Sequence, residues 1–232
     1  MTRPGALRRI LIGTLIGCVI AGLLALGVWQ LQRRTWKLDL IQRTETMLRS
    51  PPVPAPPPSA WRAITTNDAY RPVTVTGRYR PDADSYTQAT TALGGGFWVL
   101  TPLDTGRFTV LVNRGFVPPE QRGKVPAPPG TVTVTGLLRL SEPGGGFLRS
   151  NDPTQDRWYS RDVGAIAAKR GLSEVAPYFI DAAATPGKAW PRGGLTVVSF
   201  RNNHLVYALT WFGLAALLAG MTWFVARPNK RA

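Results

Sequence analysis

The stretch ILIGTLIGCVIAGLLALGVW, residues 10–29, runs for twenty residues without a charge. A second uncharged stretch, LVYALTWFGLAALLAGMTWFVA, occupies residues 205–226. Each is as long as the roughly 20 apolar residues that an α-helix needs to cross the hydrocarbon core of a bilayer. The two stretches therefore predict a membrane protein with two transmembrane α-helices, one on each side of a long central segment.

A cleaved signal peptide is the alternative interpretation of residues 10–29. Their apolar core is longer than the core of such peptides, and no small-x-small cleavage site precedes the basic segment at residues 30–34. We therefore expect the first stretch to remain as a membrane anchor.

The flanks of the two stretches predict the orientation. The basic residues of the terminal tails, which contain no acidic residue, are Arg3, Arg8, Arg9, Arg227, Lys230 and Arg231. Short basic tails stay in the cytoplasm, whereas a long loop is translocated largely regardless of its charge. We expect a multi-pass protein of a bacterial cell inner membrane, with both termini in the cytoplasm and the central domain in the periplasm.

The formal net charge of +15 raises the question of a nucleic-acid partner. All 13 acidic residues lie in the central segment, where they are mixed with the remaining cations, and no basic block or repeat is present. We expect no nucleic acid and interpret the excess charge as attraction to anionic lipid or an acidic partner. The one cysteine, Cys18, lies in the first stretch, so the central domain is expected to fold without a disulfide.

Between the spans the hydrophobic pattern changes to a period of two. Valine, threonine and aromatic residues alternate between glycine, proline and aspartate, which is typical of strands. The predicted strands are residues 72–79, 85–91, 97–103, 108–118, 131–140 and 178–182. A helix is predicted at 162–170, with Gly171 as its stop. We expect a β-rich, α+β domain whose antiparallel sheet curls into a small barrel or sandwich.

The resulting organisation has seven parts. They are a cytoplasmic tail (1–9), a transmembrane helix (10–29), a juxtamembrane helix (30–50), a proline-rich linker (51–60), a periplasmic β-rich domain (61–204), a second transmembrane helix (205–226) and a second cytoplasmic tail (227–232). The proline run at 51–58 favours polyproline II, so we interpret it as a stiff spacer and not as a ligand for another domain.

Short repeats occur within the central domain. The pentapeptide VTVTG stands at residues 73–77 and again at 132–136, and Gly-Gly-Gly-Phe follows each copy, at 94–97 and 144–147. A duplication explains this pattern, but so does convergence, since alternating valine and threonine is generic for a half-buried strand. Neither glycine triplet has the spacing of a phosphate-binding or dinucleotide motif, so both are expected to be loops.

Other polar features of the domain point to structural roles. The nearest carboxylate pairs are Asp82 with Asp84 and Asp152 with Asp156. They lie in turn-rich segments without a metal-ligand pattern, so we expect solvated turn residues. The segment VLVNRG, residues 110–115, predicts a strand buried on both faces, followed by a turn that leaves Arg114 exposed.

Small residues recur at four-residue spacing in both spans. The first span has Gly13, Gly17, Ala21 and Ala25, and the second has Ala215 with Ala219 and Ala216 with Gly220. Such ridges favour close contact between helices. Packing of the two spans on each other is the first interpretation, and contact with a span of another protein is the alternative.

His204 is the one histidine of the chain, which excludes a metal site built from several histidines. On the predicted second helix, His204, Tyr207 and Trp211 share a face, with Ala208 and Ala215 between them. Two interpretations stay open from the residues alone. One is a strip for a flat macrocycle with His204 on its iron, and the other is the aromatic belt of any membrane interface.

Four segments give the chain a recognisable pattern. They are WQLQR at 29–33 with Trp36-Lys37, GGFWVLTPL at 95–103, VLVNRGFVP at 110–118, and NNHL at 202–205 with Tyr207-Ala208 and Thr210-Trp211-Phe212. In these segments and their order, the chain resembles the surfeit-locus family, called Shy proteins in yeast, over nearly its whole length. Phe116 departs from the tryptophan expected at its position but keeps an aromatic ring.

The resemblance implies an assembly factor (chaperone) for cytochrome c oxidase of the respiratory chain, and not an enzyme. Family members promote formation of the haem centre in oxidase subunit I, and some bacterial members bind haem a through the histidine that matches His204. The resemblance thus implies haem a as a transient cargo, with His204 as axial ligand of its iron. Tyr207 and Trp211 would contact the ring, and we add Arg201 as a partner for a haem propionate.

The expected partners are oxidase subunit I, haem a synthase and membrane lipid. A haem-independent scaffold that stabilises an oxidase assembly intermediate is the competing function. An outward-facing sensor is a third, but cytoplasmic tails of about nine and six residues are too short for an output domain. The optical spectrum of the protein coexpressed with the haem a pathway separates the first two.

Overall fold

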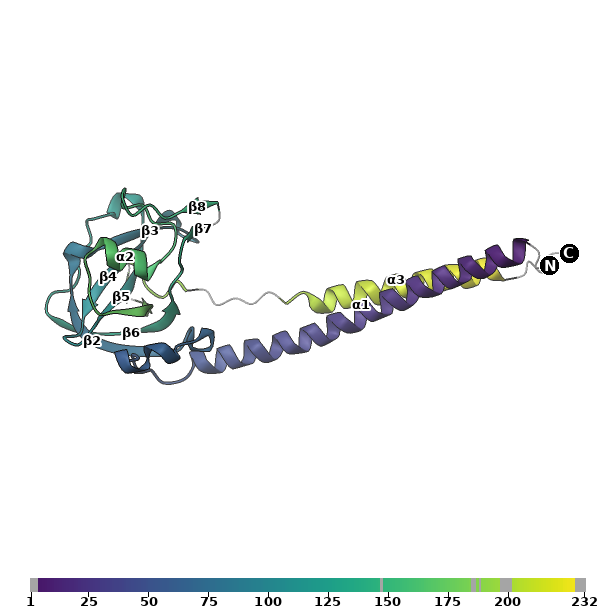
Figure 1. Ribbon diagram of the computed structural model, residues 1–232, viewed down its shortest axis with the longest axis horizontal. Helices are drawn as coiled ribbons and strands as arrows, with labels where there is room; N and C mark the ends of the chain where they lie inside the picture. Colours follow the sequence, from purple (N-terminus) through teal and green to yellow (C-terminus); the bar gives the residue numbers. More distant parts are fainter. Residues whose placement is uncertain (1–3, 147, 185–186, 188, 197–201, 228–232) are drawn as a thin grey trace. The chain divides into compact units, whose positions relative to one another are not determined.

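The computed structural model describes residues 4–146, 148–184, 187, 189–196 and 202–227 (Figure 1). The chain divides into two compact units, of which one is Thr44–Val198 and the other combines Met1–Arg43 with Ser199–Ala232. The unit Thr44–Val198 holds a closed β-sheet, and the other unit holds two long helices. The predicted fold class, two candidate membrane helices that flank a β-rich domain in the sequence, is confirmed.

The two long helices are α1 (Pro4–Leu48) and α3 (His204–Ala226), drawn in purple to blue and in yellow in Figure 1. Both are long and apolar enough to cross a membrane. The segment predicted as a separate juxtamembrane helix continues α1 without a break and ends at Leu48. His204 is the first residue of α3, so the second helix includes the histidine.

The domain contains nine strands and one α-helix among its described residues. The strands are β1 (Val53–Pro54), β2 (Pro72–Tyr79), β3 (Ser85–Thr91), β4 (Gly94–Asp104), β5 (Thr109–Val117), β6 (Thr131–Leu140), β7 (Gly145–Gly146), β8 (Arg149–Ser150) and β9 (Val175–Ala182). The helix is α2 (Val163–Lys169), which begins after the capping side chain of Asp162. Short 3-10 helices lie at Pro58–Ala63, Thr66–Asp68, Pro81–Ala83 and Pro119–Gln121.

Five strands close into a barrel in the order β2-β6-β9-β5-β4, because the end of β2 also pairs with the end of β4. The remaining members of the sheet, β1 and β3, extend it beside β2 and β4. The sheet was expected to be antiparallel, but two of its pairings are parallel. β9 runs parallel to β5, and β1 runs parallel to β2. A strand that returns after a long crossover can take the parallel direction, and α2 lies in the crossover before β9.

The two VTVTG copies pair with each other. They lie in β2 and β6, antiparallel, with Val75 opposite Val134 at the centre, so each copy is the other's partner. Their glycines occupy equivalent positions of the two strands. A Cβ at Gly77 would overlap the carbonyl oxygen of Asp104, and a Cβ at Gly136 would overlap that of Asp181. Glycine is required at both positions because another strand's backbone approaches closely there.

Alternate residues of the strands face two apolar layers. Val110 and Val112 of β5 lie in the cluster that also contains buried residues of β2, β6 and β9, whereas Leu111 packs in a second cluster with Ile166 of α2. The expectation that β5 is buried on both faces is therefore confirmed. On β9, Phe179 belongs to the second cluster in the same way.

The proline run packs along the edge of the sheet beside β2, so it is not the free spacer that was expected at 51–60. Val53 and Pro54 form β1 beside β2, and the amide of Ala55 donates to the carbonyl of Thr74. The carbonyl of Pro56 accepts hydrogen bonds from Tyr178 Oη (2.8 Å) and Trp61 Nε1 (3.1 Å). A proline lacks an amide donor but keeps its carbonyl acceptor, which suits the run to the sheet edge.

The expected glycine loops are also strands. Gly94, Gly95 and Gly96 begin β4 opposite the end of β3, and Gly145 and Gly146 form β7. A Cβ at Gly96 would overlap the carbonyl of Val117 and the ring of Phe116, so this glycine permits a close crossing.

Arg114 is buried, which contradicts its expected exposure. Leu100 of β4 pairs with Asn113 and Val99 pairs with Gly115, so Arg114 is the extra residue of a β-bulge. Its side chain is 7% exposed and donates to the carbonyls of Val125 (3.4 Å) and Pro126 (2.6 Å). A bulge redirects a side chain but lets the strand continue, whereas the expected turn at Gly115 would have ended the strand.

Two of the four aspartates expected in solvent are instead partnered within the domain. Asp84 accepts a hydrogen bond from Thr101, and its burial raises the pKa of its carboxyl group, although the bond itself acts in the opposite direction. Asp156 accepts bonds from Arg170 (2.7 and 2.8 Å) and from Trp158 Nε1 (2.7 Å).

Gly136→Ala should destabilise the domain by roughly 1–3 kcal/mol, because a methyl group forced into a filled site displaces the backbone around it. Gly95→Ala is the matched control, since no described atom lies within 4 Å of a Cβ at that position. Urea unfolding of the full chain in detergent, followed by tryptophan fluorescence, measures both. Equal midpoints for the two variants would contradict the close approach at Gly136.

Candidate functional site

α1 and α3 contact each other along one seam. Between residues 10 and 30 of α1, the less exposed positions are Ile16, Ile20, Leu23, Gly27 and Gln30. On α3 they are His204, Ala208, Trp211, Phe212, Ala215, Leu218 and Thr222. Their spacing alternates mainly between four and three residues, which is the period of a helix pair that packs knobs into holes.

One close contact between the two helices lies at Gly27. Gly27 is buried, and a Cβ there would overlap the ring of Phe212. Ala208 and Ala215 of α3 are only 0% and 3% exposed. Small residues at these positions let the two backbones come together, as they do in many membrane helix pairs.

The predicted ridges contribute little to this seam. In α1 the ridge residues Gly13, Gly17, Ala21 and Ala25 are all exposed. In α3 only Ala215 of the predicted pairs is buried. The two spans pack on each other as expected, but mostly through other residues. The ridges therefore present small side chains on the outer surface of the helix pair.

His204 lies at the end of the seam. Its Nδ1 is 2.7 Å from Oε1 of Gln30, and both side chains are half-buried. The structure gives Nε2 no hydrogen-bond partner among the described residues. One nitrogen of the imidazole is thus held by α1, and the other is left for a further ligand.

The remaining predicted site residues are separated by the seam. Trp211 is half-buried in it, whereas Tyr207 is 54% exposed beside it. Arg201 lies outside the described residues. Ala208 and Ala215 are covered, so a flat macrocycle has no open strip over them. Of the described residues predicted for the site, Tyr207 is the one that is exposed.

The outer face of the barrel carries a polar network that sequence reasoning missed. Asp181 of β9 is 3% exposed and its carboxylate accepts four hydrogen bonds. The donors are Asn113 (2.8 Å), Arg139 (2.8 Å), Arg161 (3.3 Å) and Thr196 (2.9 Å). This network joins β5, β6 and β9 to the segment before α3, so its role is to hold that segment against the barrel.

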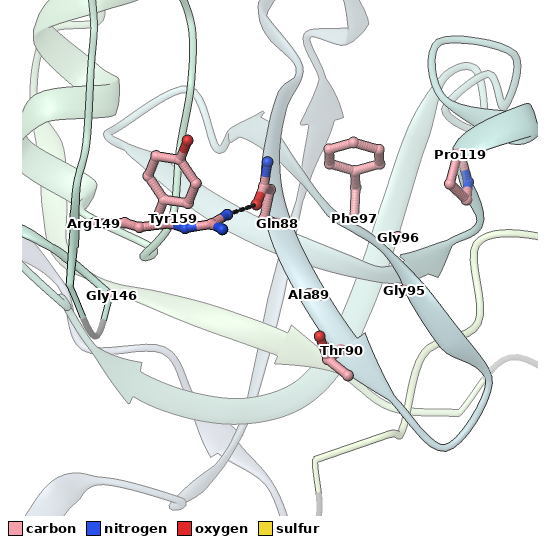
Figure 2. Close-up of a pocket in the computed structure, with 10 residues that line it drawn as sticks. All are labelled: Gln88, Ala89, Thr90, Gly95, Gly96, Phe97, Pro119, Gly146, Arg149 and Tyr159. Carbon is pink, nitrogen blue, oxygen red and sulfur yellow. Dashed lines mark hydrogen bonds between the residues drawn. The ribbon is translucent and has the colours of Figure 1, made fainter.

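A cavity of about 420 Å³ lies at the β3–β4 hairpin (Figure 2). Figure 2 shows Arg149 reaching Gln88, with a bond of 3.3 Å, beside the ring of Tyr159. The described residues that line the cavity include no acid, histidine or cysteine. The lining offers a cation and aromatic surface but no acid–base or nucleophilic pair.

Gln30 and Asn113 are the functional candidates that the sequence did not single out. Both stand inside recognisable segments, WQLQR and VLVNRG, but neither had an assigned role. The signal for Gln30 was its position, because it continues the alternating four-and-three spacing of residues 16, 20, 23 and 27. Asn113 carried no such signal, since its partner Asp181 is 68 residues away.

A β-barrel between two helices able to span a membrane, with a lone histidine at the start of the second, defines a class of membrane-anchored proteins. A model of the SURF1 family matches residues 17–216. The chain belongs to this family, as its resemblance predicted.

Relatives support the assignment over most of the chain. Surfeit locus protein 1 of Rattus norvegicus is 38% identical over 227 residues, covering 86% of this chain and 70% of the relative. The Homo sapiens protein of that name is 38% identical over 228 residues, with 86% and 72% covered. A SURF1-like protein of Monosiga brevicollis is 34% identical over 235 residues, with 88% and 83% covered.

Asn113→Ala should lower the free energy of unfolding by about 1–3 kcal/mol, because it removes the shorter hydrogen bond to a buried carboxylate oxygen and leaves only the 3.3 Å bond from Arg161. Asn67→Ala is the control, since Asn67 is exposed and its side chain is not in the network. Urea unfolding of the full chain in detergent measures the difference. A loss no larger than that of the control would show that Asp181 does not need this donor.

Proposed function

We propose that this protein is an assembly factor for cytochrome c oxidase that carries haem a toward oxidase subunit I. The observation that carries the proposal is His204, which is held by α1 through Nδ1 while Nε2 has no partner among the described residues. Membership of the SURF1 family supports the oxidase role. The haem a role rests on the histidine and its surroundings.

The residues around His204 fit a haem. A neutral imidazole supplies one axial ligand to haem iron, and the exposed ring of Tyr207 offers apolar area beside it. Arg34 is half-buried and lies about one turn beyond Gln30 on the same face of α1, where a guanidinium suits a propionate. Arg201 is a second proposed partner for a propionate.

Weak binding of haem iron suits a protein that must release its haem. His204 is the one histidine of the chain, and no group of three or more His, Cys, Asp or Glu side chains within the described ranges is placed to hold a metal ion. The protein therefore offers haem iron one imidazole and no second histidine. A carrier with one ligand is able to release its haem to a site that supplies two, which distinguishes an assembly factor from an enzyme with a resident cofactor.

A haem-independent scaffold for an oxidase assembly intermediate is the second candidate. A groove of about 400 Å³ on α3, lined by residues that include Ala216 and Gly220, favours it. Gly13 and Gly17 of α1 likewise have no described atom within 4 Å of a Cβ. Such surfaces suit a span of another membrane protein, and oxidase subunit I and haem a synthase are the proposed partners.

His204→Ala should insert and fold normally but lose haem a binding, because alanine has no lone pair to donate to iron. Tyr207→Phe should retain most binding, since it keeps the ring area. The optical spectrum of each detergent-purified protein, coexpressed with the haem a pathway, measures binding. An unchanged spectrum and affinity for His204→Ala would favour the scaffold.

The proposed location is a bacterial inner membrane, with the barrel in the periplasm and both termini in the cytoplasm. A reporter active only in the periplasm should work when inserted between Pro128 and Pro129, which are exposed between β5 and β6. The same reporter should be silent when fused after Ala232, because the basic tails stay inside. Activity at both positions would refute this orientation.

A further inference from the structure

The contact between Gln30 and His204 bears on the position of the imidazole ring and also on its tautomer. The structure places Oε1 of Gln30 opposite Nδ1 of His204, and an amide oxygen only accepts hydrogen bonds, so in this arrangement Nδ1 is the nitrogen that carries the proton. In a neutral imidazole the other nitrogen then has a free lone pair. Gln30 thereby selects the tautomer in which Nε2 is the ligand atom.

The surroundings of Gln30 keep its side chain in place. It is a polar residue at the end of an otherwise apolar series in the seam, formed by Ile16, Ile20, Leu23 and Gly27. Gly27 lies about one turn away and admits the ring of Phe212, which sets a short distance between the helices. Between two membrane helices, a hydrogen bond between polar side chains supports their association.

We propose that Gln30 is a positioning residue for a haem ligand: it orients the His204 ring, fixes the Nδ1–H tautomer and tunes the basicity of Nε2. The proposal rests on the proposed function for its haem part, but the tautomer is a property of the protein alone. Partners of this kind on metal-bound histidines commonly change metal affinity by about 10–100-fold.

The single histidine makes the tautomer directly measurable. Full-length protein labelled with ¹⁵N-histidine and purified through a histidine-free tag should show one imidazole, with Nδ1 protonated and Nε2 not. Gln30→Leu should lose this preference, whereas Gln30→Glu should keep it because a carboxylate also accepts. Gln32→Leu is the matched control, since Gln32 is an exposed glutamine on the same helix. An Nε2–H tautomer in the wild type, or an unchanged tautomer in Gln30→Leu, would overturn the proposal.

A titration with haem a tests the part of the proposal that concerns haem binding. Gln30→Leu should bind about 10–100-fold more weakly than wild type, and Gln32→Leu should bind equally well. Gln30→Glu should lower the midpoint potential of the bound haem, because a more basic imidazole stabilises ferric iron. A purely structural role for Gln30 would leave that potential unchanged, and this result would overturn the tuning.

The two proposals fail differently. If wild type shows the Nδ1–H tautomer but binds no haem a, the proposed function is wrong and the Gln30 pair serves only the helix packing. If wild type binds haem a through His204 while Gln30→Leu matches it in tautomer, affinity and potential, the proposed function stands and the role of Gln30 is wrong.

Discussion

The backbone pairing that closes the barrel between β2 and β4 is the constraint on which the domain depends. An open sheet of the same strands would leave unpaired edges, whereas closure creates an enclosed apolar layer. Neighbouring backbones come close in this sheet, and Gly77 and Gly136 leave room for the carbonyls of Asp104 and Asp181. Once the barrel is closed, its outer face is free to take α2 and the polar network of Asp181.

The helix pair follows a different physical rule. In lipid, apolar side chains gain little by meeting each other, so close packing and hydrogen bonds carry the association. Gly27 and the two covered alanines of α3 supply the packing, and the bond from His204 to Gln30 supplies the polar contact. In the proposed function the same bond would also orient the histidine for its ligand, so one interaction at the end of the seam would serve both helix packing and binding.

The domain and the helix pair consequently divide their roles. Asp181 is buried and pairs with the partly buried Arg139 and Arg161, which is the pattern of a structural network. His204 instead keeps one nitrogen without a described partner at the outer end of a helix contact. Changes in the network should act through folding, whereas changes at His204 should act through binding, and the two effects are separable by measuring stability.

Local patterns in the sequence determined most of the elements. Period-two alternation located β2, β3 and β6 at their observed bounds, and uninterrupted apolar length located the two spans. Tertiary structure alone decided the parallel pairing of β9, the burial of Arg114 and the packing of the proline run along the sheet edge. It also decided that His204 meets Gln30, 174 residues away. The physical reason is that hydrophobic period reports the local backbone and its buried face, whereas partners across the fold are set by closure and packing of the whole chain.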